Sequence, residues 1–342
     1  MNEDDVRDLL AEVEDPDLGG DIVTGNLVTD ISVEGDTAHV TLALGAPYAP
    51  NESHIAGRVR EVLREAGLEP DLSADLDTGR SGEGVLPGVQ NIIAVASGKG
   101  GVGKSTVAVN LAAGLADRGA RVGLFDADIY GPNVPRMVDA DEHPSATEDE
   151  TIIPPERYGM KLMSMAFLVG EDDPVIWRGP MVHSIITQLV EDVEWGELDY
   201  MIVDLPPGTG DTQLTMLQTV PLTGAVVVTT PEEVAVDDAR KGLEMFGRHD
   251  TPVLGIAENM GSFHCPDCGS EHNIFGEGGG EQFAEDVEMP FLGSIPLDPE
   301  IRTGAEGGEP IVMGEGSTAE AFTDLTGRVA NNVGVLNRRA RR

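Results

Sequence analysis

Cysteine and lysine are scarce in this chain of 342 residues, and each shortage excludes a class of protein. Two cysteines, Cys265 and Cys268, are too few for the disulfide framework of a small secreted domain. With four lysines, the chain lacks the broad basic face that binds nucleic acid backbones. No basic start precedes an apolar stretch, and no run of about 18 apolar residues occurs. We therefore expect a cytoplasmic protein that is neither secreted nor membrane-spanning and binds no nucleic acid.

Acidic residues are abundant by contrast. Asp and Glu number 61 against 22 Lys and Arg, which gives a formal net charge of −39. Charges of one sign repel one another in dilute buffer, but at molar salt the Debye length falls to about 3 Å and the repulsion is screened. Because the acids are spread along the chain rather than gathered in a tail, the composition resembles that of halophilic archaeal proteins and indicates a salt-filled cytoplasm.

Changes in sequence pattern divide the chain into two folded regions. Residues 1–72 combine helical spacing of apolar residues with short β-like runs, and Asn51 can cap a helix, which predicts a compact α+β domain. Residues 73–88 are polar, rich in glycine and without periodicity, which predicts a linker. Residues 89–342 alternate strand-like and helical runs, which predicts an α/β domain with a mostly parallel sheet and helices on both faces.

The segment SGKGGVGKST at residues 97–106 follows a strand-like run and precedes a helical one, as a phosphate-binding loop requires. Its glycines let consecutive backbone amides turn toward the β- and γ-phosphates of ATP. Lys104 supplies a point charge, and Ser105 supplies a hydroxyl ligand for Mg2+. The nucleotide-binding residues that we expect here are Gly98, Gly100, Gly101, Val102, Gly103, Lys104, Ser105 and Thr106.

Three aspartates follow strand-like runs of the same region. Asp126 and Asp128 come directly after residues 122–125, and Asp204 ends the run 201–203. Carboxylates at the C-terminal ends of parallel strands face the ligand crevice. By position, Asp204 is similar to a Walker B carboxylate, which holds the Mg2+ water shell. Asp128 is similar to a switch residue, which orients the attacking water. Asp126 is expected to support the metal shell.

Five motifs that occur in order carry a resemblance to a known family. They are the loop 97–106 with its early Lys99, DADIYGP at 126–132, WRGP at 177–180, DLPPGTGD at 204–211, and ENM at 258–260 followed by the cysteine pair. Together they resemble the Mrp/ApbC family of iron-sulfur cluster carrier ATPases, within the MinD/ParA-like class that has a deviant Walker A loop. The match runs from about Val89 to Val335 and implies a P-loop NTPase fold.

The resemblance also implies roles for individual residues. Members of this class form a nucleotide sandwich homodimer, in which the early lysine, here Lys99, reaches the phosphates of the partner subunit. Lys99, Lys104, Asp128 and Asp204 are thus the expected catalytic residues. Asn259 is the expected adenine reader, with residues 296–298 beside the base. The implied activity is a slow, Mg2+-dependent ATP hydrolysis, and the implied partners are apo iron-sulfur proteins and cluster donors.

Residues 1–72 resemble the small SufT-like iron-sulfur assembly domain that often precedes these ATPases. That domain commonly carries a reactive cysteine before a proline, whereas this chain has Ala46-Pro47 at the corresponding place. We therefore expect the N-terminal domain to act in partner recognition or regulation rather than through a thiol.

Cys265 and Cys268 form a Cys-x-x-Cys turn that can aim both sulfurs at one metal, yet two thiolates are half of a four-cysteine site. A neighbouring histidine, His264 or His272, could complete much of a Zn2+ site within one chain. Alternatively, two such turns related by a two-fold axis supply four thiolates, which suit either Zn2+ or a 4Fe-4S cluster. The family resemblance favours a 4Fe-4S cluster that bridges two subunits.

Two rival functions are weighed against a cluster carrier. A MinD/ParA-like positioning ATPase would share the phosphate loop without needing the cysteines. An apolar stripe from Phe322 to Leu336 before the final arginines could then lie on anionic lipid, although we expect it to pack on its own domain and the arginines to be solvated. A zinc-binding scaffold would not need Lys104 or the aspartates. We expect a homodimeric, ATP-dependent carrier that transfers a 4Fe-4S cluster to apo-proteins.

Overall fold

The computed structural model describes residues 1–75, 85–129, 131–149, 151–168, 179–265 and 268–341. Tyr130, Trp177 and Arg178 of the family motifs, and residues 266–267 of the cysteine turn, lie outside the described residues. The chain forms two compact units. The first unit is Met1–Gly82 together with Ala330–Arg342, and the second is Glu83–Val329.

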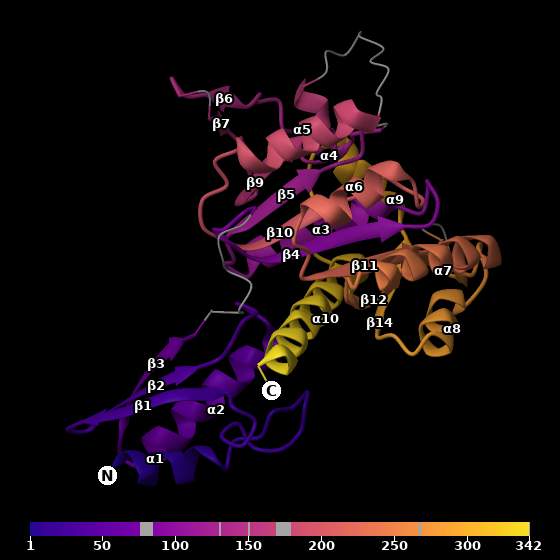
Figure 1. The fold of residues 1–342 in the computed structure, drawn as a ribbon. Coiled ribbons are helices and arrows are strands. Elements are labelled where there is room, and N and C mark those ends of the chain that lie inside the picture. The colour runs from indigo at the N-terminus through magenta and orange to yellow at the C-terminus, as the bar shows by residue number, and fades with distance from the viewer. Residues whose placement is uncertain (76–84, 130, 150, 169–178, 266–267, 342) are drawn as a thin grey trace. The chain divides into compact units, whose positions relative to one another are not determined.

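The first unit is a three-stranded sheet with two helices along one face (Figure 1). Its strands are β1 (Val28–Glu34), β2 (Thr37–Leu42) and β3 (Glu69–Ala74), and its helices are α1 (Glu3–Leu10) and α2 (Pro50–Glu65). Strands β1 and β2 are antiparallel, and β3 joins β2 in parallel after the α2 crossover. The core consists of apolar side chains from all five elements, among them Val6, Leu10, Ile31, Val40, Leu42, Ile55, Val59 and Leu63. Strand β3 extends into the segment that the sequence predicts to be a linker.

The last turns of helix α10 (Ser317–Ala340) group with the first unit, which differs from the sequence-based division at residue 89. The prediction of solvated C-terminal arginines is wrong for Arg338, which is 2% exposed. Its Nε lies 3.2 Å from Asp15 and its Nη1 3.0 Å from Glu52, and it also pairs with Asp17. Burial beside three carboxylates holds this guanidinium in place, because a charge removed from water requires charged partners.

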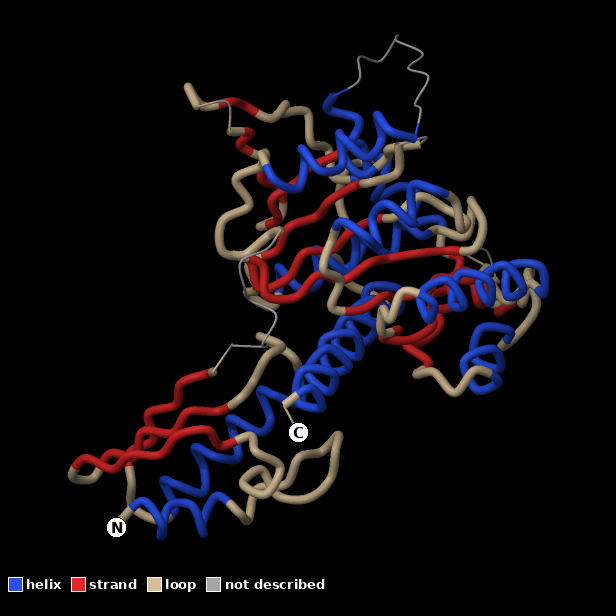
Figure 2. The backbone as a smooth tube through the Cα atoms, viewed as in Figure 1, coloured by secondary structure: helices blue, strands red, loops and turns tan. Residues whose placement is uncertain are grey.

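The second unit is built on a sheet with the strand order β13-β12-β11-β4-β10-β5-β9-β8, in which β14 also pairs with β12. The strands are β4 (Val89–Ser97), β5 (Val122–Asp126), β8 (Glu156–Arg157), β9 (Met160–Ser164), β10 (Leu198–Asp204), β11 (Gly224–Thr229), β12 (Val253–His264), β13 (Glu271–His272) and β14 (Phe291–Leu297). All neighbours are parallel except β8 with β9 and β12 with β13. The predicted mostly parallel α/β fold is confirmed, and Figure 2 shows the strands in red between blue helices.

Helices cover both faces of this sheet. Successive side chains of a strand point to opposite faces, and the run Ile92–Ala96 of β4 is buried throughout. One face packs on apolar residues of α5 (Gly179–Glu191), α6 (Asp211–Thr219), α7 (Glu233–Arg248) and α8 (Gly279–Asp286), and α3 (Lys104–Asp117) packs on β4, β5 and β10. The shorter α4 (Val134–Met137) and α9 (Pro299–Glu306) contact each other, and β6 (Ser145–Ala146) pairs with β7 (Ile152–Ile153). In the described part of the chain, no helix combines the length and apolar character needed to cross a bilayer.

Candidate functional site

The phosphate loop connects β4 to α3 and is shaped by its glycines. Gly101 and Gly103 have φ angles of +85° and +81°, in the left-handed region that glycine adopts without a steric penalty. Gly98 packs so closely on α7 that an added Cβ would collide with the backbone carbonyl of Asp238. The loop therefore presents backbone rather than side chains to the cavity, at the N-terminus of a helix, which is where phosphate oxygens are bound.

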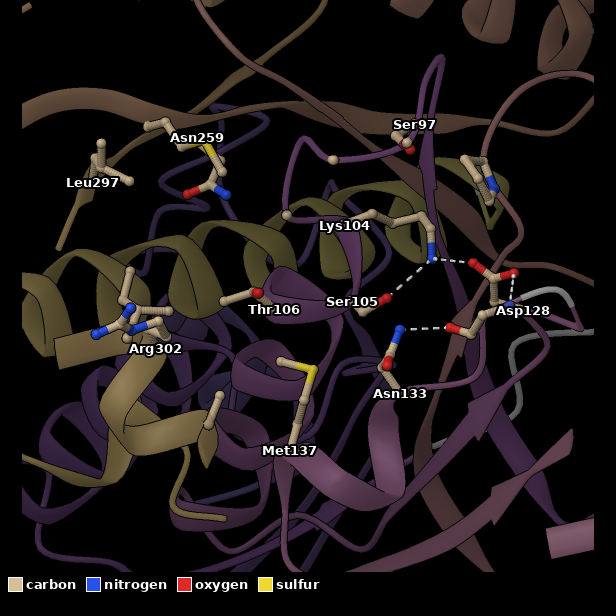
Figure 3. Close-up of a pocket in the computed structure, with 18 of the residues that line it drawn as sticks. Ser97, Lys104, Ser105, Thr106, Asp128, Asn133, Met137, Asn259, Leu297 and Arg302 are labelled. Atoms are coloured by element: carbon tan, nitrogen blue, oxygen red, sulfur yellow. Dashed lines mark hydrogen bonds and ion pairs between the residues drawn. The ribbon is translucent and has the colours of Figure 1, made fainter. Parts of the chain in front are cut away.

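Lys104 points toward Asp128 and Ser105 in the cavity (Figure 3), and it also pairs with Asp204 at the end of β10. Its Nζ is 2.5 Å from Oδ1 of Asp204, 3.9 Å from Oδ2 of Asp128 and 3.3 Å from Oγ of Ser105. The lysine side chain is 6% exposed and that of Asp204 is fully buried. Burial raises the pKa of Asp204, and the neighbouring Lys104 ammonium acts in the opposite direction. The sequence-predicted residues of the phosphate loop and two of the three aspartates are thus brought together.

Asp126 occupies a different position from the other two aspartates. It is 0% exposed, and its carboxylate accepts hydrogen bonds from the backbone amides of Asp128 and Val134 and from the Ser164 hydroxyl, at 3.1, 3.2 and 2.9 Å. Burial, followed by the charge of Asp204, raises the pKa of Asp126 to about 7. Because its oxygens hold the segment that follows β5, Asp126 positions Asp128 at the cavity rather than lining the cavity itself.

The residues around Lys104 fit a Mg2+ ion. Oδ2 of Asp204 is buried and has no hydrogen-bond partner among the described residues, which is costly unless a cation or ordered water satisfies it. Carboxylate and hydroxyl oxygens are the hard ligands that Mg2+ prefers. Ser105 and Asp204 are the side chains that would hold the ion, which when bound neutralises negative charge on the nucleotide phosphates.

A cavity of about 570 Å³ extends from the phosphate loop toward the middle of β12 and the end of β14. Asn259 lines it and donates from Nδ2 to the carbonyl of Val102 at 2.9 Å, while its Oδ1 is buried without a partner in the described structure. With the donor group engaged, the free acceptor suits an amino group such as that of adenine. Pro296, Leu297 and Asp298 line the same end of the cavity.

Sequence reasoning missed several residues of the cavity wall. Arg136 and Met137 come from α4, and Ile301 and Arg302 come from α9. These two short helices contact each other across a long sequence separation, so no local pattern could have predicted their joint position. Figure 3 shows Met137, Arg302 and Thr106 in the wall of the same cavity.

Lys99 has a partner that the sequence did not indicate. Its Nζ lies 3.1 Å from Oε2 of Glu232, the residue directly before α7. Side-chain exposures of 31% for the lysine and 42% for the glutamate leave both groups accessible to solvent. An ion pair this exposed contributes at most about 1 kcal/mol, so a nucleotide phosphate can compete with Glu232 for the lysine.

Cys265 and Cys268 lie in the turn of a hairpin formed by β12 and β13. The amide of Cys265 donates to the carbonyl of Ser270 at 2.9 Å. The amide of Gly269 donates to the carbonyl of Cys265 at 2.8 Å. The thiol of Cys268 is exposed and lies 3.3 Å from the Ser270 hydroxyl. Hydrogen bonding from Ser270 lowers the pKa of the Cys268 thiol, which favours the thiolate that metals bind.

The two neighbouring histidines do not complete a metal site with this turn. His264 lies in the hairpin opposite Glu271, with Nε2 3.9 Å from the glutamate carboxylate, and His272 pairs with Phe263. In the described ranges of the chain, no three His, Cys, Asp or Glu side chains are arranged to hold a metal ion. The described part of one chain therefore supplies two thiolates and no assembled set of further ligands.

Two family models match different parts of the chain. Residues 88–330 match the model of the NUBPL iron-transfer P-loop NTPases, and residues 3–71 match that of iron-sulfur cluster assembly proteins. The chain belongs to the NUBPL iron-transfer P-loop NTPase family. The family resemblance predicted from the sequence motifs is confirmed.

Relatives of this family match nearly the full chain. An iron-sulfur cluster carrier protein from Synechocystis sp. is 43% identical over 97% of this chain and 98% of its own length. A protein of the same name from Deinococcus radiodurans is 44% identical over 95% of this chain and 94% of its own. The iron-sulfur cluster transfer protein NUBPL of Dictyostelium discoideum is 46% identical over 74% of this chain and 79% of its own.

Solved structures agree with the P-loop fold of the family. A nucleotide-binding protein from Archaeoglobus fulgidus, determined in complex with ADP, has a TM-score of 0.60 and 37% identity, over 67% of this chain and 91% of its own. The cell division ATPase MinD from Pyrococcus furiosus has a TM-score of 0.53 and 25% identity, over 70% of this chain and 98% of its own.

Proposed function

We propose that this protein is an ATP-dependent carrier that binds a 4Fe-4S cluster and transfers it to apo-proteins. One observation supports this above all: a single unit carries both a phosphate-binding loop at a cavity and a pair of cysteines at a hairpin turn, of which Cys268 is exposed and Cys265 half-buried. The printed names of relatives that match nearly the whole chain describe iron-sulfur cluster carriers.

ATP hydrolysis is assigned to the residues around Lys104. The phosphate loop and Lys104 bind the phosphates, Ser105 and Asp204 hold Mg2+, and Asp128, at the cavity wall, orients the attacking water. Asp126 supports this arrangement by fixing the backbone of Asp128. The buried lysine and carboxylates are preorganised, which is the main requirement of phosphoryl transfer, and we expect turnover to be slow without a partner.

The cluster, which is the cargo of the protein, is assigned to a homodimer. Four thiolates hold a 4Fe-4S cluster, and each chain supplies Cys265 and Cys268. A two-fold axis through the site brings together the same turn from two subunits and completes the ligand set. Lys99, released from Glu232, then reaches the phosphates bound by the partner.

The two rival functions have less support. The likeness to MinD concerns the fold and gives no role to the cysteine pair. A zinc site within one chain would need a third ligand near the cysteines, and the described residues provide no such cluster. Zn2+ held by two chains has the same thiolate ligands as the cluster, so zinc content must be measured together with iron and sulfide.

The N-terminal unit is assigned to recognition of cluster donors or recipient apo-proteins. Ala46, which stands at the place of the reactive cysteine, is 0% exposed, and its amide donates to the Glu52 carboxylate at 2.9 Å. A side chain at this position has no access to a substrate.

With a net charge of −39, the protein is suited to a salt-rich cytoplasm.

Anaerobic purification in molar KCl tests the proposal. Iron, sulfide and zinc are measured per dimer for the wild type, for Cys265→Ser and for Lys104→Ala, together with the molar mass in solution. We expect about four iron and four sulfide per dimer in the wild type and in Lys104→Ala, and none in Cys265→Ser. Zinc without iron, or a monomer that still binds iron through these sulfurs, would overturn the assignment.

A further inference from the structure

Strand β12 carries residues of both sites that a cluster carrier must connect. Asn259 and Met260 line the nucleotide cavity, and the strand ends at His264, directly before Cys265. At about 3.3 Å per residue, the chain from Asn259 to Cys265 spans at most about 20 Å. The nucleotide cavity and the cysteine turn are therefore joined by one short stretch of backbone.

The strand is held tightly at the cavity. Glu258 is 3% exposed and accepts hydrogen bonds from the Ser294 hydroxyl of β14 at 2.8 Å and from the Gly280 amide in the first turn of α8 at 2.7 Å. Asn259 binds the carbonyl of Val102 in the phosphate loop. These contacts fix β12 to three other segments just before it leaves the cavity.

The pairing of β12 with β14 is interrupted directly afterwards. Between Asn259 and Phe263 the register shifts, because β12 advances four residues while β14 advances two, from Ile295 to Leu297. The extra residues form a β-bulge, a feature that bends a strand and changes the direction of its remaining residues. The bulge begins at Met260, which has φ +60°, a left-handed conformation that is unfavourable for a residue with a side chain.

The bulge is enclosed on the side of β14. A Cβ at Gly261 would collide with the Ser294 hydroxyl and lie 2.8 Å from Oε1 of Glu258. The side chains of Met260 and Leu297 both line the nucleotide cavity, and Leu297 pairs with Phe263 on the far side of the bulge. A base that fills this end of the cavity thus contacts both strands at the place where their pairing is irregular.

We propose that Met260 is a positioning residue, whose left-handed bulge transmits nucleotide occupancy along β12 to the cysteine turn. The biological use of this coupling rests on the proposed function, because only a cluster carrier needs it. The experiment below does not depend on that function. A nucleotide in the cavity packs on Met260 and Leu297 and restricts the bulge, and the hairpin that carries Cys265 and Cys268 is restricted with it. A ligand shifts a conformational equilibrium only by its differential contacts, and these are the contacts on the path to the cysteines.

Thiol reactivity of the cluster-free, full-length protein tests the inference. The rate of Cys268 alkylation by iodoacetamide is measured in 2 M KCl with and without a nonhydrolysable ATP analogue, kept at least about tenfold above the dissociation constant of each variant. In the wild type we expect the analogue to slow alkylation about fivefold or more, the lower end of ordinary allosteric coupling. In Met260→Gly, which frees the bulge from its fixed conformation, we expect the two rates to differ by less than about twofold.

Glu288→Gly is the matched control. Glu288 also has a left-handed φ, +55°, but it is exposed in the turn between α8 and β14 and does not line the cavity. Its replacement relieves the same kind of strain and should leave the nucleotide effect as large as in the wild type. An unchanged alkylation rate in the nucleotide-bound wild type, or a full nucleotide effect in Met260→Gly, would overturn the inference.

The alkylation experiment can succeed or fail whether or not the protein is a cluster carrier. Alkylation is measured without a cluster, so a protein that binds no iron and sulfide would contradict the carrier assignment while leaving the nucleotide effect on Cys268 measurable. Conversely, the protein could bind a cluster and hydrolyse ATP while the alkylation rate of Cys268 does not change with nucleotide. That result would support the proposed function and contradict the role of Met260.

Discussion

Lys104 Nζ and Asp204 Oδ1 lie 2.5 Å apart, joining the first residue of α3 to the last residue of β10. Both side chains are buried, and Asp128 lies 3.9 Å from the same ammonium group. A buried charge pair of this kind is costly to break, because removal of one partner leaves the other without compensation. Lys104 lines the cavity and Asp204 lies behind it, so the pair is the first target for mutation.

Replacement of Lys104 should abolish ATP hydrolysis without affecting cluster content. Lys104→Ala removes the positive charge beside the phosphates, and we expect a loss of turnover of about 100-fold or more. Lys161→Ala is the control, because its ammonium group donates to the backbone carbonyls of Glu194 and Trp195 outside the cavity. Phosphate release is measured in molar KCl, and equal rates in the two variants would contradict the assigned role.

Lys99 should matter for turnover but not for stability. Its ion pair with Glu232 is partly exposed, so Lys99→Ala should change the free energy of unfolding by less than about 1 kcal/mol. Hydrolysis should fall about 100-fold or more if the lysine acts on the partner's phosphates. Lys241→Ala provides the comparison, since Lys241 pairs with Asp238 within α7, is 67% exposed and does not line the cavity. We expect wild-type turnover for Lys241→Ala, and a similar loss in both variants would refute a specific function of Lys99.

Arg338 should be essential for the first unit. Arg338→Met leaves the buried carboxylates of Asp15 and Glu52 without their cation, which destabilises a protein by about 3–5 kcal/mol. The neighbouring Arg339 is exposed, and Arg339→Met should have an effect within about 0.5 kcal/mol. Hydrogen–deuterium exchange of residues 1–75 reports on this unit directly. Equal protection in the two variants would mean that the arginine cluster does not stabilise the unit.

The stability of the first unit should fall as the pH rises toward neutrality. Burial raises the pKa of Glu52 from 4.5 to about 7, so the folded unit binds this proton more tightly than the unfolded chain. The contribution is present in full below pH 4.5 and is lost as the pH rises through about 7, with a total on the order of 3 kcal/mol. Glu52→Gln removes the titrating group, so this pH dependence should disappear whatever the absolute stability of the variant. Exchange protection measured at pH 5, 6, 7 and 8 checks the slope, and a slope that persists in the variant would assign it to another group.

Local sequence patterns were sufficient to place the phosphate loop between a strand and a helix and to locate the cysteine pair. The phosphate loop is a contiguous segment, in which glycine spacing sets the backbone conformation over a few residues. The alternation of strands and helices also predicted the parallel sheet, because buried strands and amphipathic helices differ in periodicity. The structure adds the place of the cysteine turn at the end of β12, the strand that also carries Asn259.

Arg338 is the clearest case in which sequence reasoning failed. A basic tail after an apolar stripe has the same local pattern whether it is solvated or buried, and its partners Asp15, Asp17 and Glu52 lie about 300 residues away in the chain. The same limit applies to Glu232 beside Lys99 and to the cavity walls from α4 and α9. No periodicity links these positions.

The sequence by itself determined the fold class of this protein and the candidate groups for binding phosphate and metal. Those properties depend on residues that are close in the chain and on the side-chain spacing of each element. Only the tertiary structure decided which charges are paired and buried and how the strand leaving the nucleotide cavity is bent before the cysteines. These features depend on desolvation and packing between segments that are distant in sequence, and only folding brings those segments together.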